Sequence, residues 1–144
     1  MTGGPRILVV DDEPDSLLIA RLALAEAGYE TVLAADADRA CHWLGGGGVD
    51  LVCLDAALVL GDGPLVLQAA ADVSVPVLVV SAGPAPAGAA GYLPKPFTAL
   101  DLVEAVGATL EDWSFLRSGV RHDLEEVRGR LSRGGRPHRP GPRE

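Results

Sequence analysis

The sequence predicts an α/β protein whose doubly wound sheet has five parallel strands. Short apolar runs of Val, Leu and Ile alternate with segments of helical periodicity, and only short links join them. Aromatic residues make up 4% of the 144-residue chain, so the core must be aliphatic, which favours a buried parallel sheet over an aromatic-rich sandwich. Because crossovers between parallel strands are right-handed, we expect helices on both faces of the sheet.

Five apolar segments are expected to form the strands. Each is short, contains β-branched residues and is bounded by Gly, Pro, Asp or Ser, as buried strands usually are. The expected strands cover residues 7–10, 29–34, 49–54, 75–80 and 91–93.

Four helices are expected between and after these strands. In the first, Asp15 or Ser16 is the expected N-cap, and Leu18, Leu22 and Ala25 recur at helical spacing. The second helix is expected to begin at Asp36 or Asp38, and the third is expected to cover residues 65–71. The fourth is expected to begin at Thr98.

Charge is unevenly distributed along the chain. The formal net charge is −8, yet residues 1–112 carry 16 acidic and 4 basic side chains, whereas residues 113–144 carry 4 acidic and 8 basic ones. Because an acidic body repels phosphate groups, we expect no direct binding of nucleic acid.

The cysteines and the apolar segments indicate the cellular compartment in which the protein is expected. Cys41 and Cys53 lack metal-ligand spacing, and no secretory segment opens the chain. The uncharged run over residues 73–94 contains four prolines, which would break a membrane-spanning helix. We therefore expect a soluble, cytoplasmic protein without a membrane partner.

Polar residues follow the strands at the point where each strand ends. They are Asp11, Asp12, Asp55, Ser81 and Lys95. The carboxyl ends of parallel strands share one edge of a sheet, where binding sites form. Carboxylates that lie close together repel each other unless a cation joins them, and oxygen ligands suit Mg²⁺. The alternative, that the aspartates only cap the following helices, accounts less well for Ser81 and Lys95.

The same residues carry a family resemblance. The chain resembles the receiver domain of two-component response regulators, with the flavodoxin-like, CheY-like fold. The matching pieces are residues 7–13, 28–30, 49–55, 62–63, 76–81 and 91–97. The resemblance implies a phosphoryl group transferred to Asp55 from a sensor histidine kinase or a phosphotransfer protein, and it implies a cis Lys95-Pro96 peptide bond.

The resemblance also implies the roles of the other site residues. Asp11, Asp12, Asp55 and the backbone of Ala57 would hold Mg²⁺. Lys95 would pair with the acyl phosphate. Ser81 would move towards a phosphoryl oxygen and draw Tyr92 inward, and these two residues would form the switch.

Two departures from the family pattern lead to further expectations. Ala57 and Gly83 cannot orient a hydrolytic water, which implies a long-lived phosphorylated form. Only 14 positions separate Ser81 from Lys95, so the helix between the fourth and fifth strands is expected to be missing or reduced. Without that helix, the strand face that includes Val77, Val79 and Leu93 is expected to lack its usual cover.

The predicted domain organisation is a receiver over residues 1–112, an amphipathic C-terminal helix over 113–132 and a disordered basic tail over 133–144. The helix is predicted from an apolar stripe that could pair two chains into a homodimer or fold back onto its own domain. The stripe consists of Trp113, Leu116, Val120, Leu124, Val127 and Leu131. His122 faintly resembles a kinase phosphoacceptor, but a solvated histidine is the better interpretation.

Two functional hypotheses remain open at this point. The first is a stand-alone response regulator receiver that accepts a phosphoryl group on Asp55 and signals through altered protein–protein interaction with an unknown target. Such a chain catalyses its own phosphorylation but is not a turnover enzyme. The alternative is a degenerate receiver that acts as a phosphorylation-independent docking or dimerisation module. An Mg²⁺-dependent phosphohydrolase would need an acid where Ala57 stands.

Overall fold

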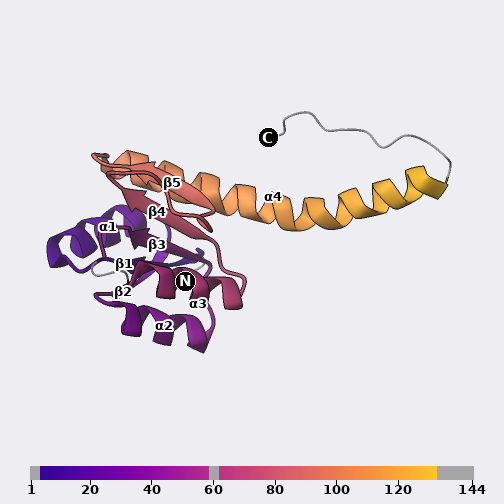
Figure 1. Cartoon of the computed structure of the whole chain (residues 1–144). Coiled ribbons are helices and arrows are strands. Elements are labelled where there is room, and N and C mark those ends of the chain that lie inside the picture. Colours follow the sequence, from indigo (N-terminus) through magenta and orange to yellow (C-terminus); the bar gives the residue numbers. More distant parts are fainter. Residues whose placement is uncertain (1–3, 59–61, 133–144) are drawn as a thin grey trace. The chain divides into compact units, whose positions relative to one another are not determined.

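The computed structural model describes residues 4–58 and 62–132, with residues 117–132 described by their backbone alone. Within these residues, five strands form one parallel sheet in the order β2-β1-β3-β4-β5 (Figure 1). The strands are β1 (Arg6–Val10), β2 (Glu30–Ala34), β3 (Leu51–Asp55), β4 (Val77–Ser81) and β5 (Gly91–Pro94). The predicted doubly wound parallel sheet is therefore confirmed, with strand limits that differ from the expected ones by one or two residues.

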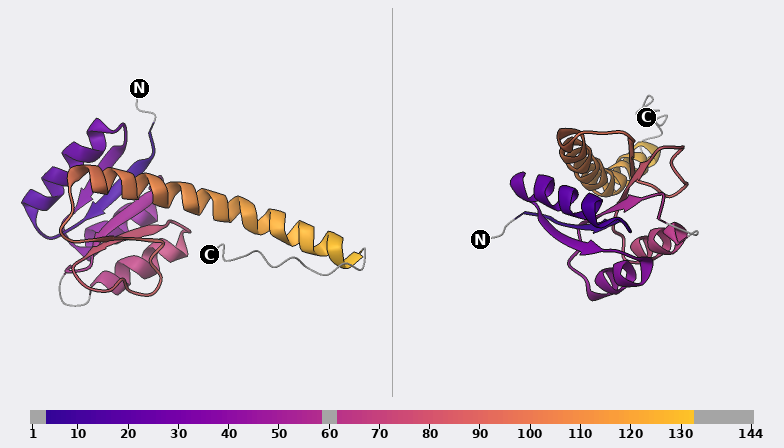
Figure 2. Two further views of the ribbon diagram at one scale, coloured as in Figure 1. Left: turned by 90° about the horizontal axis from the view of Figure 1, so that it is seen from above. Right: turned by 90° about the vertical axis from the view of Figure 1, so that its left-hand side faces the viewer.

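Helices cover both faces of the sheet, and each face has its own aliphatic core. Helices α2 (Ala37–Gly46) and α3 (Gly63–Asp72) pack on one face, where Leu8, Leu54 and Val79 are buried. Helix α1 (Pro14–Glu26) and the first turns of α4 (Ala99–Ser132) pack on the other. The end-on view in Figure 2 shows these two layers on either side of the sheet.

Helix α1 buries a different face from the expected one. Leu17, Ala20 and Leu24 point into the core, while Leu18 and Leu22 are 51% and 60% exposed. The helix is apolar around most of its circumference, so two stripes have helical spacing and the sequence alone could not choose between them. The helix also begins at Pro14, with Glu13 as the N-cap, two residues before the first expected cap, Asp15.

The start of α4 is fixed by a reciprocal cap. The backbone N–H of Asp101 donates to Thr98 Oγ1 at 3.0 Å, and the N–H of Thr98 donates to Asp101 Oδ2 at 2.9 Å. A Cβ atom at Gly91 would collide with Thr109 Oγ1, so only glycine lets β5 approach this helix closely. The cap at Thr98 was predicted from the sequence, and the close approach was not.

No helix joins β4 to β5, as predicted from the short spacing: residues 82–90 lie wholly within the described part of the chain and contain none. The expectation that this loss uncovers the strands is wrong. Val77, Val79 and Leu93 are 2%, 0% and 8% exposed. Val77 and Val79 belong to the core beneath α2 and α3, and Leu93 belongs to the opposite core beneath α4.

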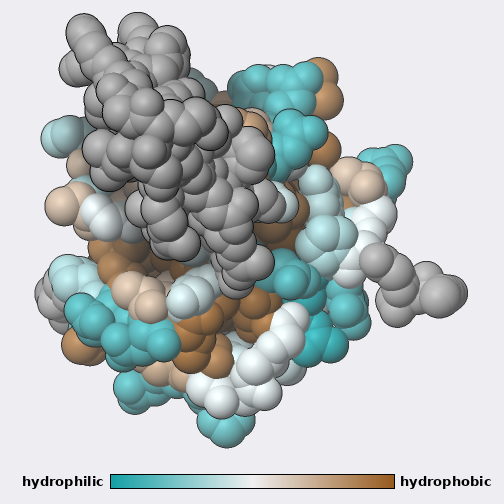
Figure 3. Space-filling model, turned by 90° about the vertical axis from the view of Figure 1, so that its right-hand side faces the viewer, coloured by the Kyte–Doolittle hydropathy of each residue, from teal (hydrophilic) through white to brown (hydrophobic). Residues whose placement is uncertain are grey.

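The end of the sheet opposite the strand carboxyl ends carries apolar surface, which Figure 3 shows in brown. Val73 is 45% exposed there, and a shallow hollow of about 230 Å³ lies between the ends of α2 and α3. In the part of the chain that the structure describes, no helix combines the length and the apolar composition needed to cross a membrane.

The chain divides into two units, Met1–Glu111 and Asp112–Glu144. The second unit contains the rest of α4, so the expected C-terminal helix is present as a continuation of the helix that begins at Ala99. The predicted disordered segment 133–144 lies outside the described residues, as do the side chains of the apolar stripe beyond Leu116 and that of His122. The predicted roles of these segments as a receiver, a C-terminal helix and a basic tail stay predictions, and so does the homodimer.

Candidate phosphoryl-acceptor site

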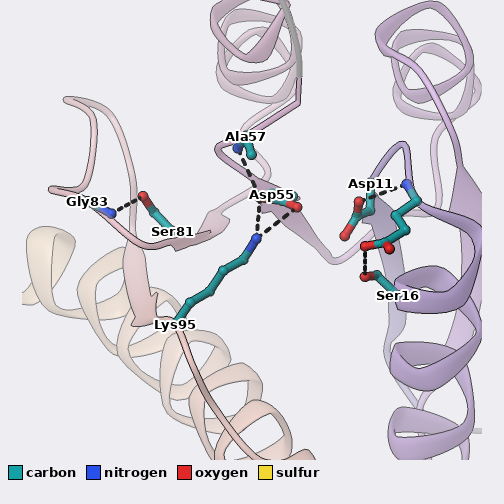
Figure 4. A network of polar contacts seen from close by, with 8 residues as sticks. Asp11, Ser16, Asp55, Ala57, Ser81, Gly83 and Lys95 are labelled. Atoms are coloured by element: carbon teal, nitrogen blue, oxygen red, sulfur yellow. Dashed lines mark hydrogen bonds and ion pairs between the residues drawn. The ribbon is translucent and has the colours of Figure 1, made fainter.

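The strand ends bring four of the predicted site residues together at one edge of the sheet. Asp11 directly follows β1, Asp55 ends β3, Ser81 ends β4 and Lys95 directly follows β5. The parallel register aligns Asp55 with Val80 of β4. Figure 4 shows the Lys95 side chain pointing towards Asp55, whereas the Ser81 hydroxyl points towards the Gly83 N–H.

Asp55 is the most buried acid of this group, with 8% of its surface exposed. The chain turns immediately after it, because the N–H of Leu58 donates to the Asp55 carbonyl at 2.9 Å. This turn directs the N–H of Ala57 onto Asp55 Oδ1, also at 2.9 Å. The backbone therefore holds one carboxylate oxygen in place.

Lys95 supplies the positive charge opposite this carboxylate. Its Nζ lies 3.1 Å from Oδ1 and 3.2 Å from Oδ2 of Asp55. The lysine backbone is anchored to the neighbouring strand, because its N–H donates to the Ser81 carbonyl at 2.9 Å. The Lys95-Pro96 peptide bond is cis, as the resemblance implied.

Asp11 adds a second carboxyl group beside Asp55. Burial raises its pKa from the ordinary 3.8 to about 6, the N–H of Glu13 opposes that rise, and the neighbouring Asp55 adds to it. The Glu13 N–H donates to Asp11 Oδ1 at 3.0 Å, and Ser16 donates to the Glu13 side chain. Asp12, the next residue, is exposed.

The hydroxyl of Ser81 is linked to Tyr92 through one residue. The N–H of Gly83 donates to Ser81 Oγ at 2.9 Å, and the Tyr92 hydroxyl donates to the Gly83 carbonyl. Tyr92 is 41% exposed, so its ring is turned outward in this structure. The sequence predicted both end residues of this connection but not the role of Gly83 as the link.

The donor set fits a hard divalent cation. Asp11 and Asp55 bring two carboxylates into a site with one lysine, so negative charge is left over, and oxygen atoms are the ligands that Mg²⁺ prefers. Within the described residues, no three His, Cys, Asp or Glu side chains already form a metal-binding group. An ion would therefore need the exposed Asp12 or backbone oxygen to complete its ligands.

Cys53 lies beneath this site, and its thiol is not suited to act as a nucleophile. It is 4% exposed, and burial, with added repulsion from Asp11 and Asp55, raises the pKa of its thiol to about 12. The thiol therefore stays protonated at neutral pH, and Cys53 acts as an apolar core residue.

Known proteins are similar to this chain in sequence. The transcriptional regulatory protein PrrA of Mycobacterium tuberculosis is 37% identical over 116 residues, covering 74% of this chain and 50% of that protein. The DNA-binding transcriptional regulator NtrC of Rhizobium meliloti is 31% identical over 135 residues, covering 85% of this chain and 28% of that protein. The chain thus spans half or less of the length of these two relatives.

Solved structures and a family model agree with these relatives. A CheY-like response regulator receiver domain protein from Methanospirillum hungatei superimposes with a TM-score of 0.70 at 25% identity, covering 78% of this chain and 98% of that one. A receiver domain from Clostridium thermocellum gives 0.68 at 24% identity, covering 78% and 98%. The model of the response regulator receiver domain matches residues 7–107. The chain therefore belongs to the response regulator receiver domain family of two-component systems.

Proposed function

We propose that Asp55 accepts a phosphoryl group from a phosphohistidine on a sensor histidine kinase or a phosphotransfer protein. A carboxylate oxygen forms the new bond to phosphorus while the phosphorus–nitrogen bond breaks. The electron pair returns to the imidazole nitrogen, which takes up a proton from solvent. The observation that carries the proposal is the buried Asp55 carboxylate with both of its oxygens within 3.2 Å of Lys95 Nζ.

The contacts of the two Asp55 oxygens distinguish their roles. Oδ1 accepts the Ala57 N–H as well as Lys95, whereas Oδ2 has Lys95 as its described contact. Oδ2 is therefore the oxygen that we assign as the nucleophile. The fixed Oδ1 orients the carboxylate, and such positioning supplies much of the rate in phosphoryl transfer.

Lys95 offsets negative charge both before and after the phosphoryl transfer. Before transfer, its ammonium group offsets the negative charge of the Asp55 carboxylate. After transfer, the same ammonium can hold a phosphoryl oxygen, because its side chain is 36% exposed and can reach outward from the carboxylate.

Asp11, Asp12 and Asp55, together with the backbone of Ala57, are the residues that we propose hold Mg²⁺. When bound, the ion neutralises the charge of the phosphoryl oxygens. Replacing the exposed Asp12 by Ala is expected to weaken Mg²⁺ binding and to leave folding unchanged.

The output is proposed to pass through residues 82–90. When Ser81 turns to a phosphoryl oxygen, it loses the Gly83 N–H, which frees Gly83, the residue whose carbonyl accepts the Tyr92 hydroxyl. Tyr92 can then leave its exposed position. The surface of the 82–90 segment changes with it, and this surface is where we expect a protein target to bind.

Direct nucleic-acid binding is not part of the proposal. PrrA and NtrC carry transcriptional names, but the matched part of the present chain is acidic, with 16 acidic and 4 basic side chains in residues 1–112. We also propose that the chain is a phosphoacceptor in the cytoplasm and not a turnover enzyme, because Ala57 stands where a phosphohydrolase would need an acid.

The test is intact-mass spectrometry of the full chain after incubation with acetyl phosphate and Mg²⁺. One added phosphoryl mass is expected, and Asp55→Asn should remove it. Asp72→Asn, which changes an exposed carboxylate bonded only to Gln68 among the described contacts, is the matched control and should label normally. Equal labelling of Asp55→Asn would show that another residue is the acceptor. No labelling of the unaltered chain would favour the docking-module alternative, which the missing β4–β5 helix makes the second candidate.

A further inference from the structure

A hollow of about 410 Å³ opens beside Asp55, and we call it the α1–α4 hollow. It lies between α1, the strand ends and the first turn of α4. Its polar part is formed by Asp11, Asp55 and Lys95, and the rest is largely apolar. A hollow of this volume, mainly apolar and with a few convergent polar groups, has the character of a small-molecule site.

Small side chains make this hollow possible. Ala20 of α1 and Ala99 of α4 line it where the two helices face each other, and neither fills the space between them. Phe97 forms an aromatic wall and remains half-buried, while Ile19 is 60% exposed at the opening. The phosphoryl-transfer chemistry proposed above uses none of these four side chains.

The polar and apolar parts of the lining require different parts of a ligand. In the polar part, two carboxylates stand with one ammonium group, so an added positive charge is favoured. Along the wall formed by Ile19, Phe97 and Leu102, a hydrated metal ion would leave apolar surface in contact with water. An organic group that covers this wall while its charged group reaches the carboxylates matches both parts.

We propose that the α1–α4 hollow binds a small organic cation, namely a protonated amine carried on a compact aryl or branched alkyl group. The ammonium group lies against Asp11 and Asp55, and the apolar group lies against Phe97 and Leu102. Because the same two carboxylates are the proposed Mg²⁺ ligands, the amine and the metal exclude each other. Binding of the amine therefore slows phosphorylation of Asp55, and both the competition with Mg²⁺ and this regulatory consequence rest on the proposed function.

The binding test uses ¹H–¹⁵N NMR of the full chain titrated with 2-phenylethylamine, with 2-phenylethanol and methylamine as the matched probes. The amine is expected to shift the signals of Cys53, Phe97 and Ala99 and to bind at least tenfold more tightly than either matched probe. Addition of 10 mM Mg²⁺ is expected to weaken amine binding about tenfold or more. Equal binding of the alcohol would overturn the charge recognition, and equal binding of methylamine would overturn the role of the apolar wall.

A filling variant tests the location. Ala99→Leu places a larger side chain at an exposed position of the hollow and should weaken amine binding at least tenfold, while labelling by acetyl phosphate continues. Ala25→Leu, at an exposed position of α1 outside the hollow, should bind the amine normally. Unchanged binding in Ala99→Leu, or no binding to the unaltered chain, would overturn the site. If the amine binds but acetyl phosphate does not label the chain, the proposed function fails and the binding site stands.

Discussion

The two chain connections that leave β3 and β4 begin alike and then diverge. In each, the N–H two residues after the polar strand end donates back to that side chain at 2.9 Å, from Ala57 to Asp55 and from Gly83 to Ser81. The first connection continues into α3, which buries Val66 and Ala70. The second has no helix over residues 82–90, a stretch that the structure describes in full.

This difference separates the site from the surface around it. Asp55 and Ser81 are oriented by their own strands and by the next two residues, so neither needs a helix after it. The hydrogen bond from the Lys95 N–H to the Ser81 carbonyl likewise helps to hold the end of β5 beside β4 without a helix. The family's chemistry can therefore be complete in a chain whose surface beyond β4 is remodelled.

The largest expected difference between the connections is in stability. Val66→Ala in α3 removes two fully buried methyl groups and should lower the free energy of unfolding by about 2 kcal/mol. Ala85→Ser in the second connection changes an exposed position and should stay within about 0.5 kcal/mol. Urea denaturation of both variants measures this. Equal losses would mean that residues 82–90 contribute to the fold as much as α3 does.

Asp11, which follows β1 next to β3, predicts a pH dependence. Because burial raises the pKa of Asp11 to about 6, the folded protein holds this proton more tightly than the unfolded chain does. Mg²⁺ needs the ionised form, so its affinity should be about tenfold lower at pH 5 than at pH 7. Without Mg²⁺, the stability contributed by this group is lost as the pH rises from about 4 through 6.

Calorimetric titration with Mg²⁺ at the two pH values provides this measurement. Asp11→Asn is the control, because it removes the titrating group and should flatten the dependence between pH 5 and 7. The same affinity at both pH values in the unaltered chain would contradict the role of Asp11 as a ligand.

The two residues that donate back to Asp55 and Ser81 should set the lifetime of the phosphorylated form. Neither Ala57 nor Gly83 carries a polar side chain that could orient water, so dephosphorylation should be slow. Ala57→Asn and Gly83→Glu should each speed it several-fold, because positioning of the attacking water supplies much of the rate. The decay of the phosphorylated mass after removal of acetyl phosphate measures the rate. Unchanged decay in both variants would refute this explanation.

The smallest expected effect is at Tyr92. Tyr92→Phe removes the hydrogen bond to the Gly83 carbonyl at a partly exposed position, so the loss of stability should be at most about 1 kcal/mol. The NMR signals of residues 82–90 should nevertheless shift, because the bond ends in that segment. Thr109→Ser, on the other side of β5, should leave those signals in place.

The sequence predicts the sheet well because buried strands are continuous apolar runs that end abruptly at polar residues such as Asp11, Asp55 and Ser81. It also predicts the missing helix, since nine residues cannot hold a covering crossover. It fails at α1, whose sequence is apolar on nearly every side, so only packing against the sheet selects Leu17 over Leu18.

The candidate site is predicted only in part for a related reason. The sequence reveals Asp55, Lys95 and Ser81, because charged and hydroxyl groups at strand ends differ clearly from the apolar residues around them. The sequence does not reveal the Gly83 link or the α1–α4 hollow, because Gly83 contributes only its backbone atoms and the hollow arises from the small size of Ala20 and Ala99. Neither leaves a chemical signature in the sequence.

The most direct test of the central claim is ¹H–¹⁵N NMR of the full chain with Mg²⁺ before and after addition of beryllofluoride, which mimics a phosphoryl group on a carboxylate. Large shifts are expected at Asp55, Ala57 and Lys95, followed by shifts at Gly83 and through residues 82–90 up to Tyr92. Asp55→Asn should show none of them. Unchanged spectra of the unaltered chain, or shifts that persist in Asp55→Asn, would contradict the assignment of Asp55 as the acceptor.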